Sequence, residues 1–160
     1  SIGVRDMLVD IGEIWCDGMN PSGKPWAVGV DRPFDRSVDG TDETGADLDG
    51  IWSSDGRPCG VVTSGNYRKY YVRDGKKYAH SIDPRTGYPV EHSLLSATVV
   101  SSESAAAADA VATWCMVSGE GEARALILSD PALEGYLIRA GEDGEMVEWA
   151  SPGFSLLTSN

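Results

Sequence analysis

The sequence predicts an α+β domain in which a mostly antiparallel sheet carries its helices on one face. Short apolar runs of strand length recur along the chain, and turn-forming residues bound most of them. Two aromatic-rich runs flank Asp74-Gly75, a dipeptide that strongly indicates a β-hairpin. The helical segments, at residues 105–117 and 121–128, follow one another late in the chain. This order of elements favours an α+β arrangement.

Before the central hairpin we expect three or four strands. Residues 7–11 and 26–30 are predicted to pair with each other through a long connection that contains a turn at 20–23. One or two more strands lie within residues 51–63. Residues 31–50 are rich in Asp, Gly, Ser and Thr, so we expect an acidic surface loop within the domain. Their spacing matches no EF-hand, which argues against a calcium site.

After the hairpin we expect a strand at residues 94–100 that leads directly into the first helix. Ser101, Ser102 and Ser104 are candidate N-caps for that helix, and Gly119 ends it. A closing hairpin of residues 135–140 and 145–150 follows the second helix, with a short strand expected in the tail.

Composition limits the classes of partner. The chain of 160 residues is long enough for one domain or for part of a larger one, and no apolar run is long enough to span a bilayer. A net charge of -12 argues against a nucleic-acid partner. An anionic small molecule remains compatible with this charge if a metal ion offsets it locally.

The three cysteines, Cys16, Cys59 and Cys115, match no zinc-binding spacing. We interpret them as isolated thiols. At most one disulfide can form among them, and the sequence does not demand it.

The central hairpin, residues 67–73 and 76–82, brings His80 to a polar loop at residues 81–87. Loops of this kind often carry ligand-binding residues. The alternative is an ordinary hairpin whose histidine is hydrogen-bonded in the core or faces water.

Asp109 is unusual because the helix that contains it is apolar apart from this residue and Thr113, one turn further on. A helix that is apolar on all sides is expected to be buried, and an unpaired carboxylate inside it would cost several kcal/mol. Asp109 therefore needs a partner. Three kinds are open: an arginine or lysine, a cluster of backbone amides, or a hard cation.

Several segments together resemble the ApbE family of FAD:protein FMN transferases. The resemblance covers essentially the whole chain and rests on segments that occur in the family's order. They are LVDIG at residues 8–12, NPSGKPW at 20–26, TSGNY at 63–67, HSIDPRTG at 80–87 and ADAVAT at 108–113.

The resemblance implies an ApbE-like fold and a Mg²⁺-dependent reaction. Family members cleave FAD, attach FMN to a threonine or serine hydroxyl of a target flavoprotein, and release AMP. Asp109 and Thr113 correspond to the Mg²⁺ ligands. FAD and an acceptor flavoprotein are the implied partners, and no nucleic acid is expected.

The resemblance also assigns roles in the central segment. His80 matches the histidine implicated in catalysis, and Asp83 is expected to orient it or help to position the metal. Ile82 is placed where the loop meets the flavin nucleotide. The remaining cofactor-binding candidates are Ser64, Gly65 and Thr86. Arg85 and Lys77 are either phosphate contacts or solvated surface charges.

Two departures from the family pattern shape our expectations. The family usually has a Gly-Gly pair after Leu-Val-Asp-x, whereas here Gly12 is followed directly by Glu13, as if one glycine were deleted. The N-terminal half of the family's length lies outside residues 1–160, so we expect these residues to be the C-terminal part of the domain and the missing half to complete the pocket. The family habit implies a periplasmic or extracytoplasmic, membrane-anchored lipoprotein. Two alternatives remain: FAD hydrolysis to FMN and AMP, and a non-catalytic flavin-binding domain.

Overall fold

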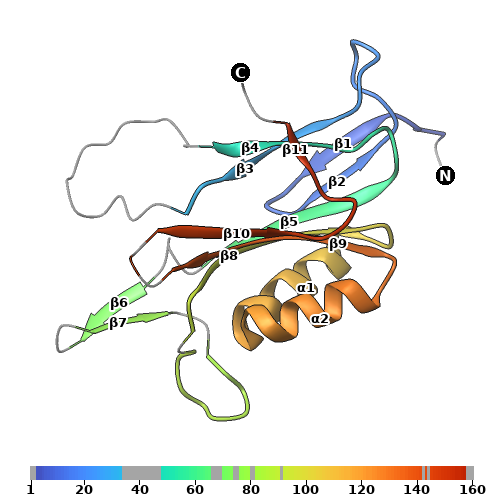
Figure 1. The fold of residues 1–160 in the computed structure, drawn as a ribbon. Helices are drawn as coiled ribbons and strands as arrows, with labels where there is room; N and C mark the ends of the chain where they lie inside the picture. The colour runs from blue at the N-terminus through green and yellow to red at the C-terminus, as the bar shows by residue number, and fades with distance from the viewer. Residues whose placement is uncertain are drawn as a thin grey trace.

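A computed structural model describes residues 3–33, 48–65, 70–73, 76–79, 82–90, 92–141, 143 and 145–157, with the backbone alone for 70–73 and 76–79. Figure 1 shows a pair of helices, a central sheet and a smaller sheet stacked as three layers. Every pairing between described strands is antiparallel. The predicted α+β fold class is confirmed, with both helices on one face of the central sheet.

The central sheet contains six of the described strands. Their spatial order is β1 (Met7–Asp10), β2 (Ile14–Asp17), β5 (Cys59–Gly65), β8 (Leu94–Ser101), β9 (Leu133–Ala140) and β10 (Met146–Ala150). The longest strands, β8 and β9, lie inside the sheet. Their apolar residues are buried on both faces because a layer packs against each face.

The smaller sheets flank this centre. Strand β4 (Leu48–Ser53) pairs with β3 (Ala27–Asp31) and with β11 (Leu156–Leu157). The predicted central hairpin is confirmed for the backbone as β6 (Tyr70–Arg73) paired with β7 (Lys76–Ala79). Its Asp-Gly turn lies outside the described residues.

The first helix, α1 (Ala105–Ser118), begins and ends as the sequence predicts. The Ser104 side chain accepts a hydrogen bond from the Ala107 N–H at 3.0 Å. Gly119 adopts a φ of +83° and donates its N–H to the Cys115 carbonyl at 2.9 Å. The second helix, α2 (Glu120–Ser129), follows after Gly119 alone.

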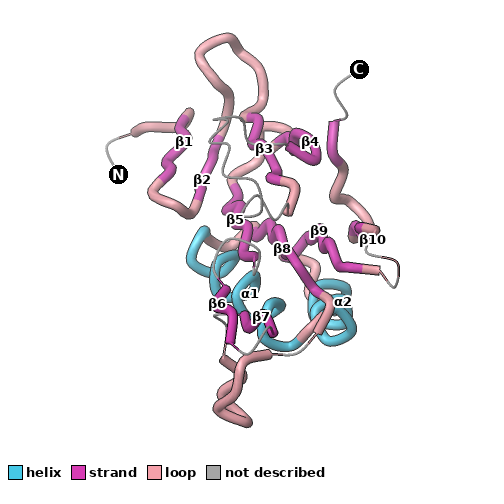
Figure 2. Tube along the Cα trace, turned by 90° about the vertical axis from the view of Figure 1, so that its left-hand side faces the viewer, coloured by secondary structure: helices cyan, strands magenta, loops and turns pink. Residues whose placement is uncertain are grey.

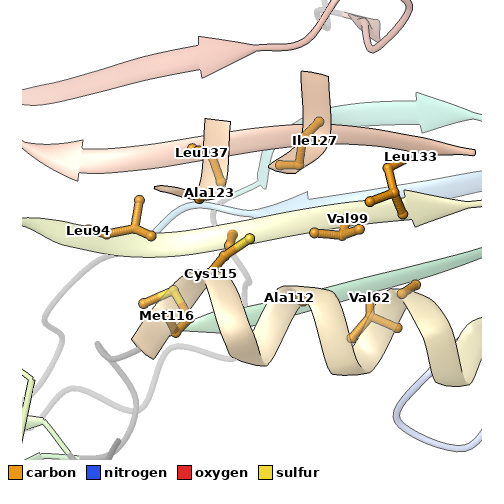
Figure 3. Packing of buried hydrophobic residues seen from close by; sticks show 12 residues of the cluster. Val62, Leu94, Val99, Ala112, Cys115, Met116, Ala123, Ile127, Leu133 and Leu137 are labelled. Atoms are coloured by element: carbon orange, nitrogen blue, oxygen red, sulfur yellow. The ribbon is translucent and has the colours of Figure 1, made fainter. Parts of the chain in front are cut away.

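Two apolar cores hold the layers together. Figure 3 shows the first, between the helices and the central sheet. Its buried residues are Val62, Leu94, Ala97, Val99, Ala108, Ala112, Cys115, Met116, Ala123, Ile127, Leu133 and Leu137. The second lies between the two larger sheets and is built from Cys16, Val28, Val30, Trp52, Cys59, Val61, Val100, Tyr136, Ile138 and Phe154.

The predicted pairing of the first strands is wrong. Strand β1 pairs with β2, which the sequence analysis missed, and β3 pairs with β4. A tight turn makes the first pairing possible, since the Asp10 carboxylate accepts the Gly12 N–H at 3.0 Å and Gly12 has a φ of +109°. The ends of the predicted 31–50 loop also belong to strands β3 and β4, and residues 34–47 lie outside the described residues.

The interpretation of three isolated thiols is wrong for two of them. Cys16 and Cys59 are directly opposite in the β2–β5 pairing, and their Sγ atoms lie 3.6 Å apart. The two cysteines lie far apart in the sequence. Their contact could not be predicted because it depends on the β2–β5 pairing, which was not predicted. Cys115 is buried in the helix-side core, where burial raises the pKa of its thiol to about 12.

Candidate functional site

One face of α1 is not covered by the described chain. Ala108, Ala112, Cys115 and Met116 are buried against the sheet, whereas Ala106, Ala110, Thr113 and Trp114 are exposed. Trp114 retains 38% of its accessible surface. The expectation of a helix buried on all sides is therefore wrong. The pattern misled because alanine is compatible with either environment, and the sheet covers only one side of the helix.

Asp109 lies at the edge of this uncovered face and is half-buried. No hydrogen bond or ion pair from the described residues reaches its carboxylate, so the arginine, lysine and amide partners left open by the sequence are not found there. Thr113 lies one helical turn further on and is exposed. Two oxygen donors are thus available on one side of α1 for a hard cation.

The described residues contain no cluster of three or more His, Cys, Asp or Glu side chains suited to a metal. This donor set still fits Mg²⁺, which typically keeps several water ligands and uses one or two carboxylates together with substrate phosphates. Asp109 and Thr113 would be the protein's share of such a site.

Ser64 and Gly65 occupy the end of β5, opposite Ala97 and Ser96 of β8. Side chains alternate along a strand, and Val62 faces α1, so Ser64 lies on the helix side of the sheet. Both Ser64 and Gly65 are half-buried. Of the predicted cofactor-binding pair, Ser64 therefore lies on the same side of the sheet as α1, and Gly65 is the next residue of the strand.

The loop that follows β7 is closed on itself. Ile82 and Pro89 form an isolated bridge, and the Asp83 N–H donates to the Tyr88 carbonyl at 2.9 Å. The Asp83 carbonyl in turn accepts the N–H groups of Thr86 and Gly87 at 3.2 and 2.7 Å. Ile82 remains 47% exposed at the mouth of this loop. These hydrogen bonds give the loop a defined shape.

The Asp83 carboxylate is used within the loop. It accepts the Arg85 backbone N–H at 2.8 Å and the Arg85 Nε–H at 3.0 Å. The Arg85 side chain, supported by the backbone N–H, holds the pKa of Asp83 below its usual value. Arg85 Nη1 also lies 3.8 Å from a carboxylate oxygen of Glu122 on α2. These contacts favour a surface ion-pair role for Arg85 over a phosphate contact.

Figures 1 and 2 both show the 82–90 loop extending from the helix side of the molecule. The end of β5, this loop and α1 therefore bring six of the eight predicted site residues to the helix side of the sheet: Ser64, the loop residues Ile82, Asp83 and Thr86, and Asp109 with Thr113. Among the described residues, no hydrogen bond joins Asp109 or Thr113 to the loop. His80 and the side chain of Lys77 lie outside the described residues.

His92 has a role that the sequence did not reveal. It is exposed, yet its Nδ1 accepts the Leu94 N–H at 3.2 Å. Nε2 must then carry the proton, and it donates to the Met116 carbonyl at 2.9 Å. The ring ties the end of α1 to the start of β8. Nothing in the sequence connects these distant positions.

The Asp83–Arg85 contact predicts a pH dependence. Because the folded-state pKa of Asp83 is lowered, the contact stabilises the loop above the ordinary aspartate pKa of about 3.9 and is lost as the pH falls through the lowered value. An NMR titration should place the pKa of Asp83 below that of a free aspartate. Arg85→Ala should raise it, and Glu122→Gln should change it much less. A pKa unaffected by Arg85→Ala would contradict the assignment.

The chain is similar to proteins of one known family. A model described as the ApbE family matches residues 1–137. The FAD:protein FMN transferases of Salmonella typhimurium and Escherichia coli (strain K12) are 35% and 37% identical to the chain over 153 residues. In both cases the alignment covers 95% of this chain and 40% of the relative.

Comparison with solved structures gives the same family. The flavin transferase ApbE from Vibrio cholerae matches with a TM-score of 0.72 at 31% identity, over 93% of this chain and 43% of that protein. The apo form of the Pseudomonas stutzeri flavinyl transferase ApbE gives a TM-score of 0.70 at 33% identity. The chain spans about 40% of the length of the curated relatives it matches. Since the family model covers most of its residues, the chain belongs to the ApbE family.

Proposed function

We propose that this chain forms part of a Mg²⁺-dependent FAD:protein FMN transferase, which transfers FMN from FAD to a threonine or serine hydroxyl of a target flavoprotein and releases AMP. The observation that carries the proposal is the pair Asp109 and Thr113. They lie in an ApbE-family chain, one turn apart on the uncovered side of α1, and no described residue engages the carboxylate.

Asp109 and Thr113 would hold the metal through a carboxylate and a hydroxyl oxygen. When bound, Mg²⁺ would neutralise negative charge on the FAD pyrophosphate. Rigid placement of the two oxygens matters because a misplaced ligand weakens the site. The N-cap, the Gly119 C-cap and the His92 contact fix both ends of α1 and so supply this rigidity.

The closed loop would bind the flavin nucleotide. Ile82 offers an exposed apolar side chain, and Thr86 lies within the same turn. Because the loop's hydrogen bonds are already formed, little conformational entropy would be lost on binding. Ser64 and Gly65 would contribute from the end of β5.

His80 is proposed as the general base that accepts the proton of the attacking hydroxyl, since imidazole exchanges protons near neutral pH. Asp83 is bonded to Arg85 in its own loop. We therefore propose that Asp83 fixes the shape of the segment that carries His80. Its effect on the orientation of the histidine is then indirect.

Product analysis tests the proposal. The chain is combined with a polypeptide supplying the part of a relative's length that it does not span, and then given FAD, Mg²⁺ and a threonine-containing acceptor peptide. Transfer predicts equal amounts of AMP and acceptor-linked FMN. Free FMN with AMP would instead indicate FAD hydrolysis. Nucleotide binding without AMP release would indicate a non-catalytic flavin-binding domain.

A binding measurement adds a further prediction. Because the chain spans about 40% of its relatives and offers two protein oxygens to the metal, it should bind FAD more weakly than micromolar by itself. Isothermal titration with Mg²⁺ present checks this. A micromolar dissociation constant for the chain alone would contradict the expectation of a shared pocket.

A further inference from the structure

We propose that Cys16 and Cys59 are a redox-active pair that closes to a disulfide between β2 and β5. The two residues are direct partners in the antiparallel β2–β5 pairing, and their Sγ atoms are 3.6 Å apart. Both side chains are buried, with 0% and 1% of their surface exposed. This proposal does not depend on the flavin transferase activity.

The backbone geometry suits a cross-link. Directly opposed residues of antiparallel strands have Cα atoms about 4.5 or 5.5 Å apart, and both values lie within the range of roughly 4.4–6.8 Å seen in disulfides. The two sulfur atoms already face each other across the strand pair. Rotation of the side chains, without a change of register, therefore suffices to bring them to bonding distance.

The alternative roles of a buried thiol pair are metal binding and simple packing. In the described part of the chain no third cysteine, histidine or carboxylate joins the pair as a metal site. Packing alone does not require two sulfur atoms to share a hydrogen bond across neighbouring strands.

The surroundings shift the pKa values of the two thiols in opposite directions. The hydrogen bond from Cys59 lowers the pKa of Cys16, and the positive charge of Arg57 lowers it further. The same hydrogen bond, together with burial, raises the pKa of Cys59. Arg57 is held in place by two hydrogen bonds to Glu134, at 2.5 and 2.9 Å. Cys16 is therefore the better nucleophile of the pair.

The oxidant required is a disulfide, either a small one such as glutathione disulfide or one carried by a thiol oxidoreductase. The Cys16 thiolate attacks one sulfur of that disulfide, displaces the other as a thiolate, and forms a mixed disulfide. Cys59 then loses its proton and attacks the Cys16 sulfur, which releases the second oxidant thiol. Two protein thiols lose two electrons and two protons, and the oxidant becomes two thiols.

Access requires a local opening, because both sulfur atoms are buried. The β1–β2 hairpin lies at the edge of the central sheet, and β2 is joined to β5 by three residue pairs. Short edge elements open more readily than central strands. Oxidation should therefore occur during such opening or during folding, and the closed disulfide would then fasten the hairpin to β5.

Thiol counting after refolding in a glutathione redox buffer tests the proposal. Free thiols are then alkylated in denaturant and mapped by mass spectrometry. We expect one alkylated cysteine, Cys115, and a peptide pair linked through Cys16 and Cys59. The cross-link closes a loop between residues 43 apart, so the melting temperature should rise by roughly 10 °C. Reduction of the disulfide should lower the melting temperature to its original value.

Three variants make the result specific. Cys115→Ser should retain the cross-link and its thermal shift. Cys16→Ala and Cys59→Ala should each lack both, while remaining folded by circular dichroism. Three free thiols after refolding, glutathione adducts without a cross-link, a disulfide that includes Cys115, or a lower melting temperature of the cross-linked form would each overturn the proposal.

Discussion

Asp109→Ala is expected to reduce Mg²⁺-dependent AMP release by at least about 100-fold, because a bound metal contributes several kcal/mol to stabilising charge in the transition state. The fold should be unaffected. Asp109 is half-buried and has no partner among the described residues, and alanine is the better helix former. Loss of activity together with an unchanged or slightly raised melting temperature would mark this carboxylate as functional.

The assay measures AMP by chromatography for the chain combined with the remaining part of the family's length. Thr113→Val should reduce AMP release less, by about tenfold, because it removes one neutral ligand and leaves the carboxylate in place. Glu103→Ala is the matched control, because its carboxylate is exposed just before α1 and should not affect turnover. Wild-type AMP release by Asp109→Ala would remove the basis for a metal site on α1.

Gly60→Ala is expected to destabilise the chain by about 3 kcal/mol or more, which corresponds to roughly 10 °C in melting temperature. A β-carbon at this position would lie 2.5 Å from the Ala105 nitrogen and 2.6 Å from the Ser104 carbonyl oxygen. These are backbone atoms at the first turn of α1, so they can move only if the helix moves. The close approach of β5 and α1 therefore depends on glycine.

Gly121→Ala provides the comparison. This glycine lies near the start of α2, and an added β-carbon would meet nothing within 4 Å. The substitution should be neutral or should stabilise by up to about 1 kcal/mol, since alanine favours the helix. Thermal unfolding followed by circular dichroism distinguishes the two variants. Equal melting temperatures would contradict the packing of α1 on β5.

The local elements were largely predictable, whereas their partners were not. The apolar run that became β8 and the serine and glycine that bound α1 are encoded within a few residues, so sequence patterns reveal them. Strand β2 escaped because four residues, IWCD, carry too little periodicity to stand out. Because β2 was not predicted, neither the pairing of β1 nor the contact of Cys16 with Cys59 could be predicted.

The site residues stay predictions from the resemblance, and the contacts around them could not be predicted from the sequence. The resemblance supplied Asp109, Thr113 and the 80–87 segment because these lie in short motifs. The ion pair of Arg85 with Glu122 and the histidine contact to the Met116 carbonyl depend on how distant segments pack. The uncovered face of α1 was missed because its many alanines do not distinguish buried from exposed positions.

The central claim is that this chain supplies the metal-binding part of a flavin transferase site that the rest of the family's length completes. The most direct measurement is Mg²⁺-dependent AMP release from FAD by the chain alone, by the complementary polypeptide alone, and by the two together. We predict turnover only for the mixture, abolished by EDTA and restored by Mg²⁺. Equal turnover by the complementary polypeptide alone, or none in the mixture, would contradict the claim.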